Sequence, residues 1–206
     1  MTLILDRRRL LGLATGAGVA AALPLPALAS EKVVGDIVLG DADAPLTVIE
    51  YASFTCPHCM RFHTDTWPRV KADYVETGKI RFILREVYFD PYGLWASMIA
   101  RCGGREAFYP LADALMEQQD TWTRAEDRAA AIQKIGRANG LSSADMRECL
   151  QDRGFAEELV ERYKQTAAED GIQSTPSFVI AGEVTTGNMG YEEFSALLDA
   201  ALADVS

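Results

Sequence analysis

The sequence predicts an α/β protein with a mixed sheet flanked by helices and an all-helical insert. Three observations indicate this fold class. A strand–helix–strand order follows the N-terminal segment, a long stretch then shows helical spacing with few strand signals, and two short strands and a helix close the chain. A strand–helix–strand unit favours a parallel pair with a right-handed crossover, so the sheet should contain both parallel and antiparallel strands.

The first part of the sheet is predicted on either side of a cysteine pair. A short strand is expected over residues 36–39. Leu46–Ala52 is β-branched and aromatic, which is typical of a buried strand. Residues 60–77 show helical spacing, with Pro68 expected to kink the helix. Residues 79–89 alternate between apolar and polar side chains and predict the next strand.

The helical insert is predicted over residues 91–163, between a first part at 30–90 and a second part at 164–206. Ile132 and Ile135 should share one buried face of a helix. Farther along, Ser142 and Asp145 resemble a capping box that opens the next helix.

The chain is expected to return to the sheet after a helix that Gly171 ends. Strands are predicted over residues 177–180 and 183–186. Between them, residues 181–182 form a hairpin signal. An amphipathic helix over residues 191–202 closes the fold.

Composition limits the function classes. The chain of 206 residues is 49% hydrophobic and has a formal net charge of −10. That size fits one domain, or one domain with an insert. The negative charge argues against nucleic-acid binding, since no basic surface would neutralise phosphates.

The N-terminal segment, residues 1–29, is interpreted as a cleaved signal peptide. Arg7, Arg8 and Arg9 precede an apolar run, and a small-residue cleavage site covers residues 27–29. An uncleaved anchor helix is the alternative, although the run is short for a membrane span. The arginines also resemble a twin-arginine signal, so both export routes stay open. Export would place the cysteines where disulfides persist.

The sequence Cys56-Pro57-His58-Cys59 is the candidate reactive site because it follows a strand and opens a helix. The helix N-terminus favours negative charge, which should lower the pKa of Cys56 and make it the attacking thiolate. Three residues on, Cys59 can attack the mixed disulfide and release the product. Pro57 removes an N–H group that would be unpaired, and His58 can add positive charge or a donor.

The motif Phe54–Cys59 resembles the active site of the DsbA-like thiol:disulfide oxidoreductases of the thioredoxin superfamily. Downstream, Ser174–Phe178 is similar to the cis-proline loop of that family, and Glu50 matches its buried acidic residue. The resemblance implies a thioredoxin fold with an inserted helical domain. It also implies a cis bond before Pro176 that exposes the backbone of Thr175 to a peptide substrate. A trans proline at the start of a strand is the alternative.

Two further roles follow from the resemblance. Glu50 could carry protons during exchange, unless it faces water at a strand edge. Arg81 and Arg85 are candidates for the lysine that often pairs with this acid in the family, and neither is favoured. Cys102 and Cys149 resemble the second, structural disulfide that some members carry, with two buried free thiols as the alternative.

The resemblance implies a periplasmic oxidase that donates disulfides to reduced exported polypeptides. A DsbB-like membrane quinone reductase would re-oxidise it, and neither an organic cofactor nor a metal is required. A monomer is expected, since no dimerisation domain fits between Ser30 and the first strand. Thr175 departs from the valine of the best-known DsbA, which keeps a reductase or isomerase open. A chaperone and a metal carrier that uses Cys56, Cys59 and His63 also stay open as hypotheses, although a surface or packing role is favoured for His63.

Overall fold

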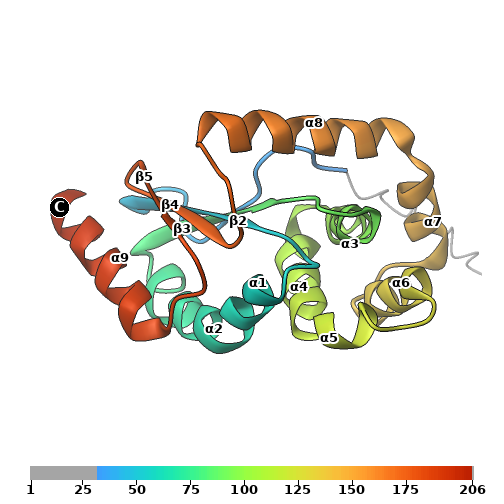
Figure 1. Cartoon of the computed structure of the whole chain (residues 1–206), viewed down its shortest axis with the longest axis horizontal. Helices are drawn as coiled ribbons and strands as arrows, with labels where there is room; N and C mark the ends of the chain where they lie inside the picture. The colour runs from blue at the N-terminus through green and yellow to red at the C-terminus, as the bar shows by residue number, and fades with distance from the viewer. Residues whose placement is uncertain (1–31, 206) are drawn as a thin grey trace, which may run out of the picture.

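The computed structural model describes residues 32–205 and confirms the α/β class, the mixed sheet and the helical insert (Figure 1). The predicted signal peptide, residues 1–29, lies outside these described residues. Within them, one sheet has the strand order β1-β3-β2-β4-β5. The strands are β1 (Val38–Leu39), β2 (Leu46–Ala52), β3 (Ile80–Glu86), β4 (Ser177–Ile180) and β5 (Glu183–Thr186).

The sheet has the mixed pairing that the element order predicts. The central strand β2 pairs in parallel with β3 and antiparallel with β4, while β1 and β5 lie antiparallel at the two edges. The turn between β4 and β5 is the predicted hairpin. Ala181 and Gly182 both have positive φ, 50° and 85°, as the favoured two-residue hairpin turns require.

Helices cover both faces of the sheet, and the insert packs beside it. In Figure 1, α8 lies over one face, while α1, α2 and α9 lie against the other. The flanking helices are α1 (Pro57–Arg61), α2 (Trp67–Val70), α8 (Arg153–Glu169) and α9 (Tyr191–Val205). The insert contains α3 (Pro91–Cys102), α4 (Gly104–Glu117), α5 (Gln119–Trp122), α6 (Arg128–Ala138) and α7 (Ser143–Gln151).

The helical run after β2 begins at Pro57, three residues before the predicted start. Two wider π-helical segments, η1 (Phe62–Thr66) and η2 (Lys71–Val75), lie on either side of α2. Pro68 lies within α2, near its start. Proline has no N–H group to donate to the preceding helical turn. The α-helical hydrogen-bond pattern is therefore interrupted just before Pro68, which is where the wider turn of η1 lies.

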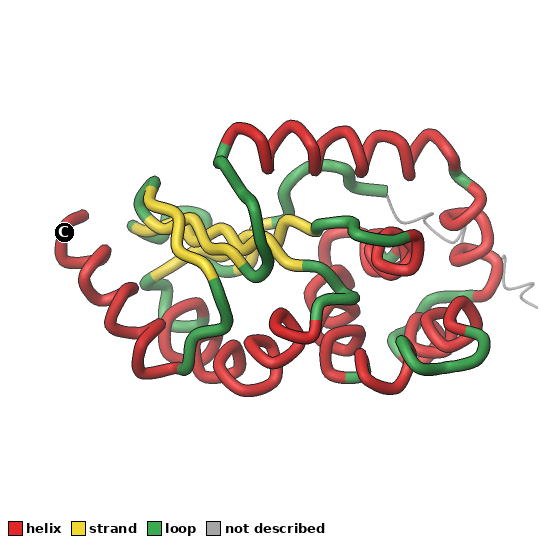
Figure 2. Tube along the Cα trace, viewed as in Figure 1, coloured by secondary structure: helices red, strands yellow, loops and turns green. Residues whose placement is uncertain are grey.

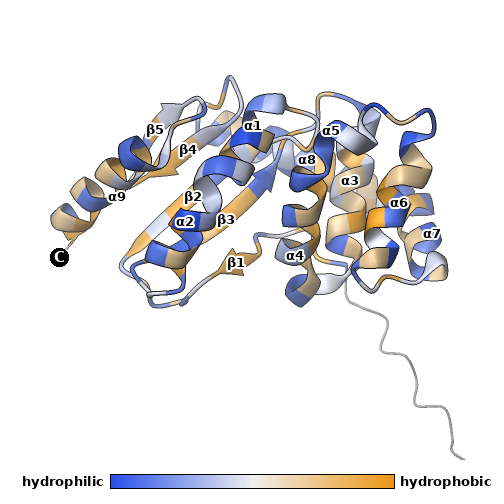
Figure 3. Ribbon diagram, turned by 90° about the horizontal axis from the view of Figure 1, so that it is seen from below, coloured by the Kyte–Doolittle hydropathy of each residue, from blue (hydrophilic) through white to orange (hydrophobic). Residues whose placement is uncertain are grey.

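Aromatic rings fill the core between the sheet and the helices that carry the cysteine pair and the C-terminus. The rings of Phe62, Phe178 and Phe194 contact one another at centroid distances of 4.7 to 5.1 Å. All three side chains are fully buried, and each such burial stabilises the fold by about 1.5–3 kcal/mol. Figure 3 shows β2 and β3 in mainly hydrophobic colours between helices whose outer faces are more hydrophilic.

The insert consists of helices and loops, as Figure 2 shows between β3 and β4. Ile132 and Ile135 of α6 are both buried. The Ser142 side chain accepts the Asp145 N–H at 3.1 Å and so caps α7. The predicted boundary at residue 163 falls within α8, which continues to Glu169 and joins the insert to the sheet. No helix in residues 32–205 has the length and apolar character needed to cross a membrane.

Candidate active site

The candidate reactive cysteines lie where β2 leads into α1. Cys56 is the N-cap residue of α1, with an extended backbone, and Pro57 occupies the first helical turn. The Cys56 carbonyl accepts the N–H of Met60 at 3.1 Å, which closes that turn. Cys56 is half-buried and Cys59 is buried, and neither forms a disulfide. Pro57 and His58 between them are exposed, so one sulfur faces the surface and the other faces the core.

Several hydrogen-bond donors surround the Cys56 sulfur. The Cys59 thiol is the strongest, and the Thr175 side chain and the backbone N–H groups of Cys59 and His58 add to it. Together they lower the pKa of Cys56 to about 5, although partial burial opposes them. Donors to a thiolate favour the charged form, and N–H groups at a helix start act in the same direction. Cys56 is therefore a thiolate at neutral pH.

Cys59 has the opposite environment. Burial raises its pKa well above the usual range of a thiol, and the hydrogen bond to Cys56 and the negative charge of Glu50 raise it further. Cys59 therefore keeps its proton when Cys56 has lost its own. Since the thiolate is the nucleophile, Cys56 is the sulfur equipped to react first.

The loop before β4 lies against the Cys56 sulfur. The Thr175–Pro176 peptide bond is cis, as the resemblance implied. The Thr175 carbonyl oxygen lies 3.6 Å from Cys56 Sγ and accepts a hydrogen bond from this sulfur when it is protonated. The loop is held from its other side, where the Ser177 hydroxyl donates to the carbonyl of Ser174 at 2.7 Å. The structure thus brings Cys56 together with Thr175, across a separation of 119 residues.

Glu50 is fully buried on the central strand β2, so the strand-edge alternative is wrong. Its partner is neither Arg81 nor Arg85. Arg81 bonds to the Thr47 hydroxyl and Arg85 forms an ion pair with Asp36. The partner is His63, whose Nε2 lies 2.9 Å from Glu50 Oε2.

His63 is 4% exposed, so of the surface and packing roles expected for it, the structure excludes the surface location and agrees with packing. The four-residue spacing from Cys59 could have indicated that both residues face the same side of the helical run. Nothing in the local pattern pairs the histidine with a carboxylate on the neighbouring strand.

Two further contacts hold the loop before Cys56 and have no sequence motif to indicate them. The buried Gln119 of α5 donates through Nε2 to the carbonyls of Phe54 and Cys56, at 2.9 and 3.0 Å. The Thr55 hydroxyl donates to Asp90 at 2.7 Å, and the same carboxylate caps α3. The insert therefore fixes the position of the reactive turn from two helices.

The three residues of the metal-carrier alternative are not arranged as ligands. His63 directs Nε2 at Glu50, and within the described residues no group of three His, Cys, Asp or Glu side chains is arranged to hold a metal ion.

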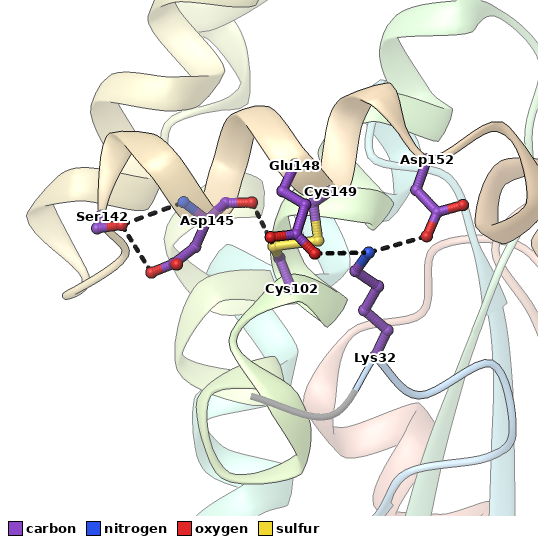
Figure 4. The surroundings of a disulfide bond; sticks show 7 residues. All are labelled: Lys32, Cys102, Ser142, Asp145, Glu148, Cys149 and Asp152. Carbon is purple, nitrogen blue, oxygen red and sulfur yellow. Dashed lines mark hydrogen bonds and ion pairs between the residues drawn. A yellow bond between two sulfur atoms is a disulfide. The ribbon is translucent and has the colours of Figure 1, made fainter. Parts of the chain in front are cut away.

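Cys102 and Cys149 form a disulfide between the C-terminal end of α3 and the last turn of α7 (Figure 4). Their Cα atoms lie 6.1 Å apart, and both residues are buried. Nearby, the Lys32 ammonium group contacts Glu148 and Asp152 at 3.5 and 2.8 Å. These ion pairs attach the start of the described chain to α7 and to the turn that follows it.

Comparison with known proteins identifies the family. A sequence model described as "Thioredoxin" matches residues 32–200. A Rickettsia bellii protein named as a protein-disulfide oxidoreductase is 33% identical over 170 residues, which cover 82% of this chain. They cover 65% of that relative, so the chain spans less than two thirds of the relative's length.

Solved structures are similar over most of the chain. The crystal structure of Wolbachia pipientis alpha-DsbA1 is 27% identical and has a TM-score of 0.77, covering 89% of this chain and 95% of that one. A structure titled as a protein-disulfide isomerase from Novosphingobium aromaticivorans is 25% identical, with a TM-score of 0.70 and coverages of 82% and 97%.

Proposed function

This chain belongs to the thioredoxin superfamily and is DsbA-like, and from that premise we propose that it is a periplasmic thiol:disulfide oxidase. The single observation that carries the proposal is the opposed state of the two thiols. Cys56 has a pKa of about 5, whereas that of Cys59 is raised. A stabilised thiolate favours the reduced form of the pair, and so makes its disulfide oxidising.

The reaction begins when a thiolate of a reduced exported polypeptide attacks Cys56 Sγ of the oxidised pair. The new bond joins the substrate sulfur to Cys56, the Cys56–Cys59 bond breaks, and the electron pair goes to Cys59, which takes up a proton. A second substrate thiolate then attacks the substrate sulfur of the mixed disulfide. Cys56 leaves as a thiolate, and the substrate keeps the new disulfide.

The surroundings of Cys56 assign further roles. The backbone of Thr175, which lies beside the Cys56 sulfur in a half-buried loop, pairs with an extended substrate segment. Pro57 and His58 are exposed and lie where they can contact the incoming polypeptide. Re-oxidation requires an external disulfide donor, for which a DsbB-like membrane quinone reductase is the expected partner. We expect the protein to act as a monomer, without a metal or organic cofactor.

An isomerase or reductase is the second candidate, and one residue favours it. Thr175 occupies the position before the cis proline, where isomerase-type relatives often carry threonine. The structure titled as a protein-disulfide isomerase points in the same direction. The same two cysteines would serve, with the direction of electron flow decided by the reduction potential of the pair.

The redox equilibrium of Cys56 and Cys59 with glutathione tests the direction. The oxidised and reduced fractions are measured by mass after alkylation, with C56S as the control that cannot form the pair. A potential of about −120 mV, as for DsbA, supports the oxidase. A potential of about −270 mV, as for thioredoxin, contradicts it and favours a reductase.

A further inference from the structure

Two polar atoms beneath the reactive cysteines are buried without a hydrogen-bond partner. Within the described residues three such side-chain atoms exist: Glu50 Oε1, His63 Nδ1 and Ser97 Oγ. The first two belong to the same ion pair, which is joined through its other two polar atoms. Since unpaired buried polar groups are rare and costly, two of them on one pair indicate a function beyond holding the fold together.

The pair lies between the buried sulfur and the protein surface. On its inner side, the Glu50 charge raises the pKa of Cys59. On its outer side, His63 Nδ1 faces Asp113 Oδ1 of α4 at 3.9 Å. The side chain of Asp113 is 24% exposed, whereas those of Glu50 and His63 are 0% and 2% exposed.

We propose that His63 and Asp113 form a proton relay that connects Glu50, and through it the Cys59 sulfur, with solvent. The proposal rests on the proposed thiol–disulfide chemistry and adds the route of its proton. Both residues act through Glu50 and touch neither sulfur nor substrate, so they are positioning residues for the proton transfer.

The relay moves one proton in each half of the cycle. When a substrate thiolate attacks Cys56, the S–S bond breaks and Cys59 Sγ receives the electron pair and a proton from the relay. During re-oxidation, the Cys56 thiolate attacks an external disulfide. Cys59 then returns its proton to the relay, attacks Cys56 Sγ and expels the donor's thiolate.

Histidine suits this position because its charge changes near neutral pH. Burial opposes the charged form of His63, but the charge and hydrogen bond of Glu50 and the charge of Asp113 raise its pKa. On the inner side, the charge of Glu50 raises the pKa values of Cys59 of α1 and Tyr109 of α4.

At 3.9 Å, the gap between His63 and Asp113 is longer than a hydrogen bond, so transfer needs a small movement. Asp113 Oδ1 accepts from Trp67 Nε1 at 3.1 Å, and Oδ2 accepts from Lys71 Nζ at 3.4 Å. Like His63, these two donors lie on the helical run after β2. Rotation of the Asp113 carboxylate can therefore break its hydrogen bond with Trp67 and bring Oδ1 to His63 Nδ1, while α4 stays in place.

The relay is tested with 5,5′-dithiobis(2-nitrobenzoate) and the reduced full chain, followed by stopped-flow absorbance. In the first phase Cys56 attacks the reagent and releases one coloured thiolate. In the second phase Cys59 loses its proton, attacks Cys56 Sγ and releases another. Only the second phase requires proton removal from Cys59, and C59S identifies it because this variant should give the first phase alone.

H63Q and D113N interrupt the relay, and D199N is the matched control. Asp199 of α9 also accepts a hydrogen bond from a buried aromatic side chain, the Tyr74 hydroxyl at 2.8 Å, but it lies away from the cysteines. We expect H63Q and D113N to slow the second phase about tenfold at pH 7. In both variants the rate of the second phase should then rise steadily with pH. Added imidazole should restore the second-phase rate in D113N. D199N should leave both phases unchanged.

Either variant can overturn the relay. Second-phase rates and pH profiles equal to those of the unsubstituted chain would do so, and so would slowing in H63Q but not in D113N. If H63Q fails to fold, D113N decides the question, because Asp113 is partly exposed. Failure of the proposed thiol–disulfide chemistry at Cys56 and Cys59 is a different result: the unsubstituted chain would then show no second phase.

Discussion

The molecule contains two cysteine pairs, and their surroundings differ in almost every respect. Cys56 and Cys59 lie within one helical turn, are present as free thiols, and have pKa values shifted in opposite directions. Cys102 and Cys149 join two helices of the insert across 47 residues and form a buried disulfide. The position of a cysteine pair in the fold therefore decides its chemistry: donors at a helix start make one pair exchangeable, while burial between helices protects the other.

The largest expected effect is the difference in thiol–disulfide exchange rate between a variant that lacks the reactive pair and one that lacks the buried disulfide. C56S should abolish exchange with a disulfide reagent, because the remaining thiol has a raised pKa and is buried. Replacing both Cys102 and Cys149 by alanine should leave the exchange rate within about threefold, since the two residues lie on α3 and α7 of the insert and the reactive turn lies at α1. Both rates are measured by stopped flow at pH 7, and a large loss in the double variant would contradict the separation of the two pairs.

The same double variant should be much less stable. Loss of a bridge that closes a loop of 47 residues lowers the free energy of unfolding by about 4 kcal/mol in the chain-entropy model. Urea unfolding measures the difference, with Cys56 and Cys59 kept reduced in both proteins. An unchanged midpoint would show that the insert needs no bridge.

Opening the Cys56–Cys59 disulfide should have the opposite sign of effect, because the thiolate that it releases adds to the stability of the fold. Because the pKa of Cys56 is lowered to about 5 in the fold from about 9 when unfolded, the thiolate stabilises the reduced protein at neutral and higher pH. This contribution should grow as pH rises from 5 to 8 and disappear as pH falls through 5, whereas the oxidised protein has no such thiol. Cys59 keeps its proton throughout this range. The difference in Tm between the two forms, followed from pH 4 to 8, checks the sign.

The smallest effect concerns a single donor to Cys56. T175V removes the hydroxyl that helps to lower the pKa of Cys56, so this pKa should rise and alkylation by iodoacetamide at pH 5 should slow about two- to threefold. T175S keeps the hydroxyl and is the control. Equal slowing in both variants would assign the effect to packing of the loop rather than to the hydrogen bond.

Local sequence signals were enough for most of the fold. The bounds of β2, β4 and β5 match their predictions, because β-branched runs ended by turn residues depend little on distant contacts. The first strand was predicted over residues 36–39, but the structure has only Val38–Leu39. As an edge strand, β1 forms hydrogen bonds with β3 alone among the described strands, so its length is set by how far β3 runs beside it.

The site was predictable only where a motif exists. The motif identified Cys56 and Cys59, and the resemblance identified the loop at Pro176. By contrast, the contacts of Gln119 with the reactive turn and of His63 with Glu50 depend on how helices pack against the loop and the sheet. Such contacts join residues 13 to 65 positions apart, and no local periodicity encodes them.

The contact between Cys56 and Thr175 spans 119 residues, and this spacing has a consequence during synthesis. During synthesis Cys56 leaves the ribosome 119 residues before Thr175. Until the second half of the sheet docks, Cys56 lacks the Thr175 contact and the complete surroundings that lower its pKa. A nascent or truncated chain thus carries a less reactive thiol than the finished protein, so its own cysteines are less prone to cross-linking before the Thr175 loop has docked.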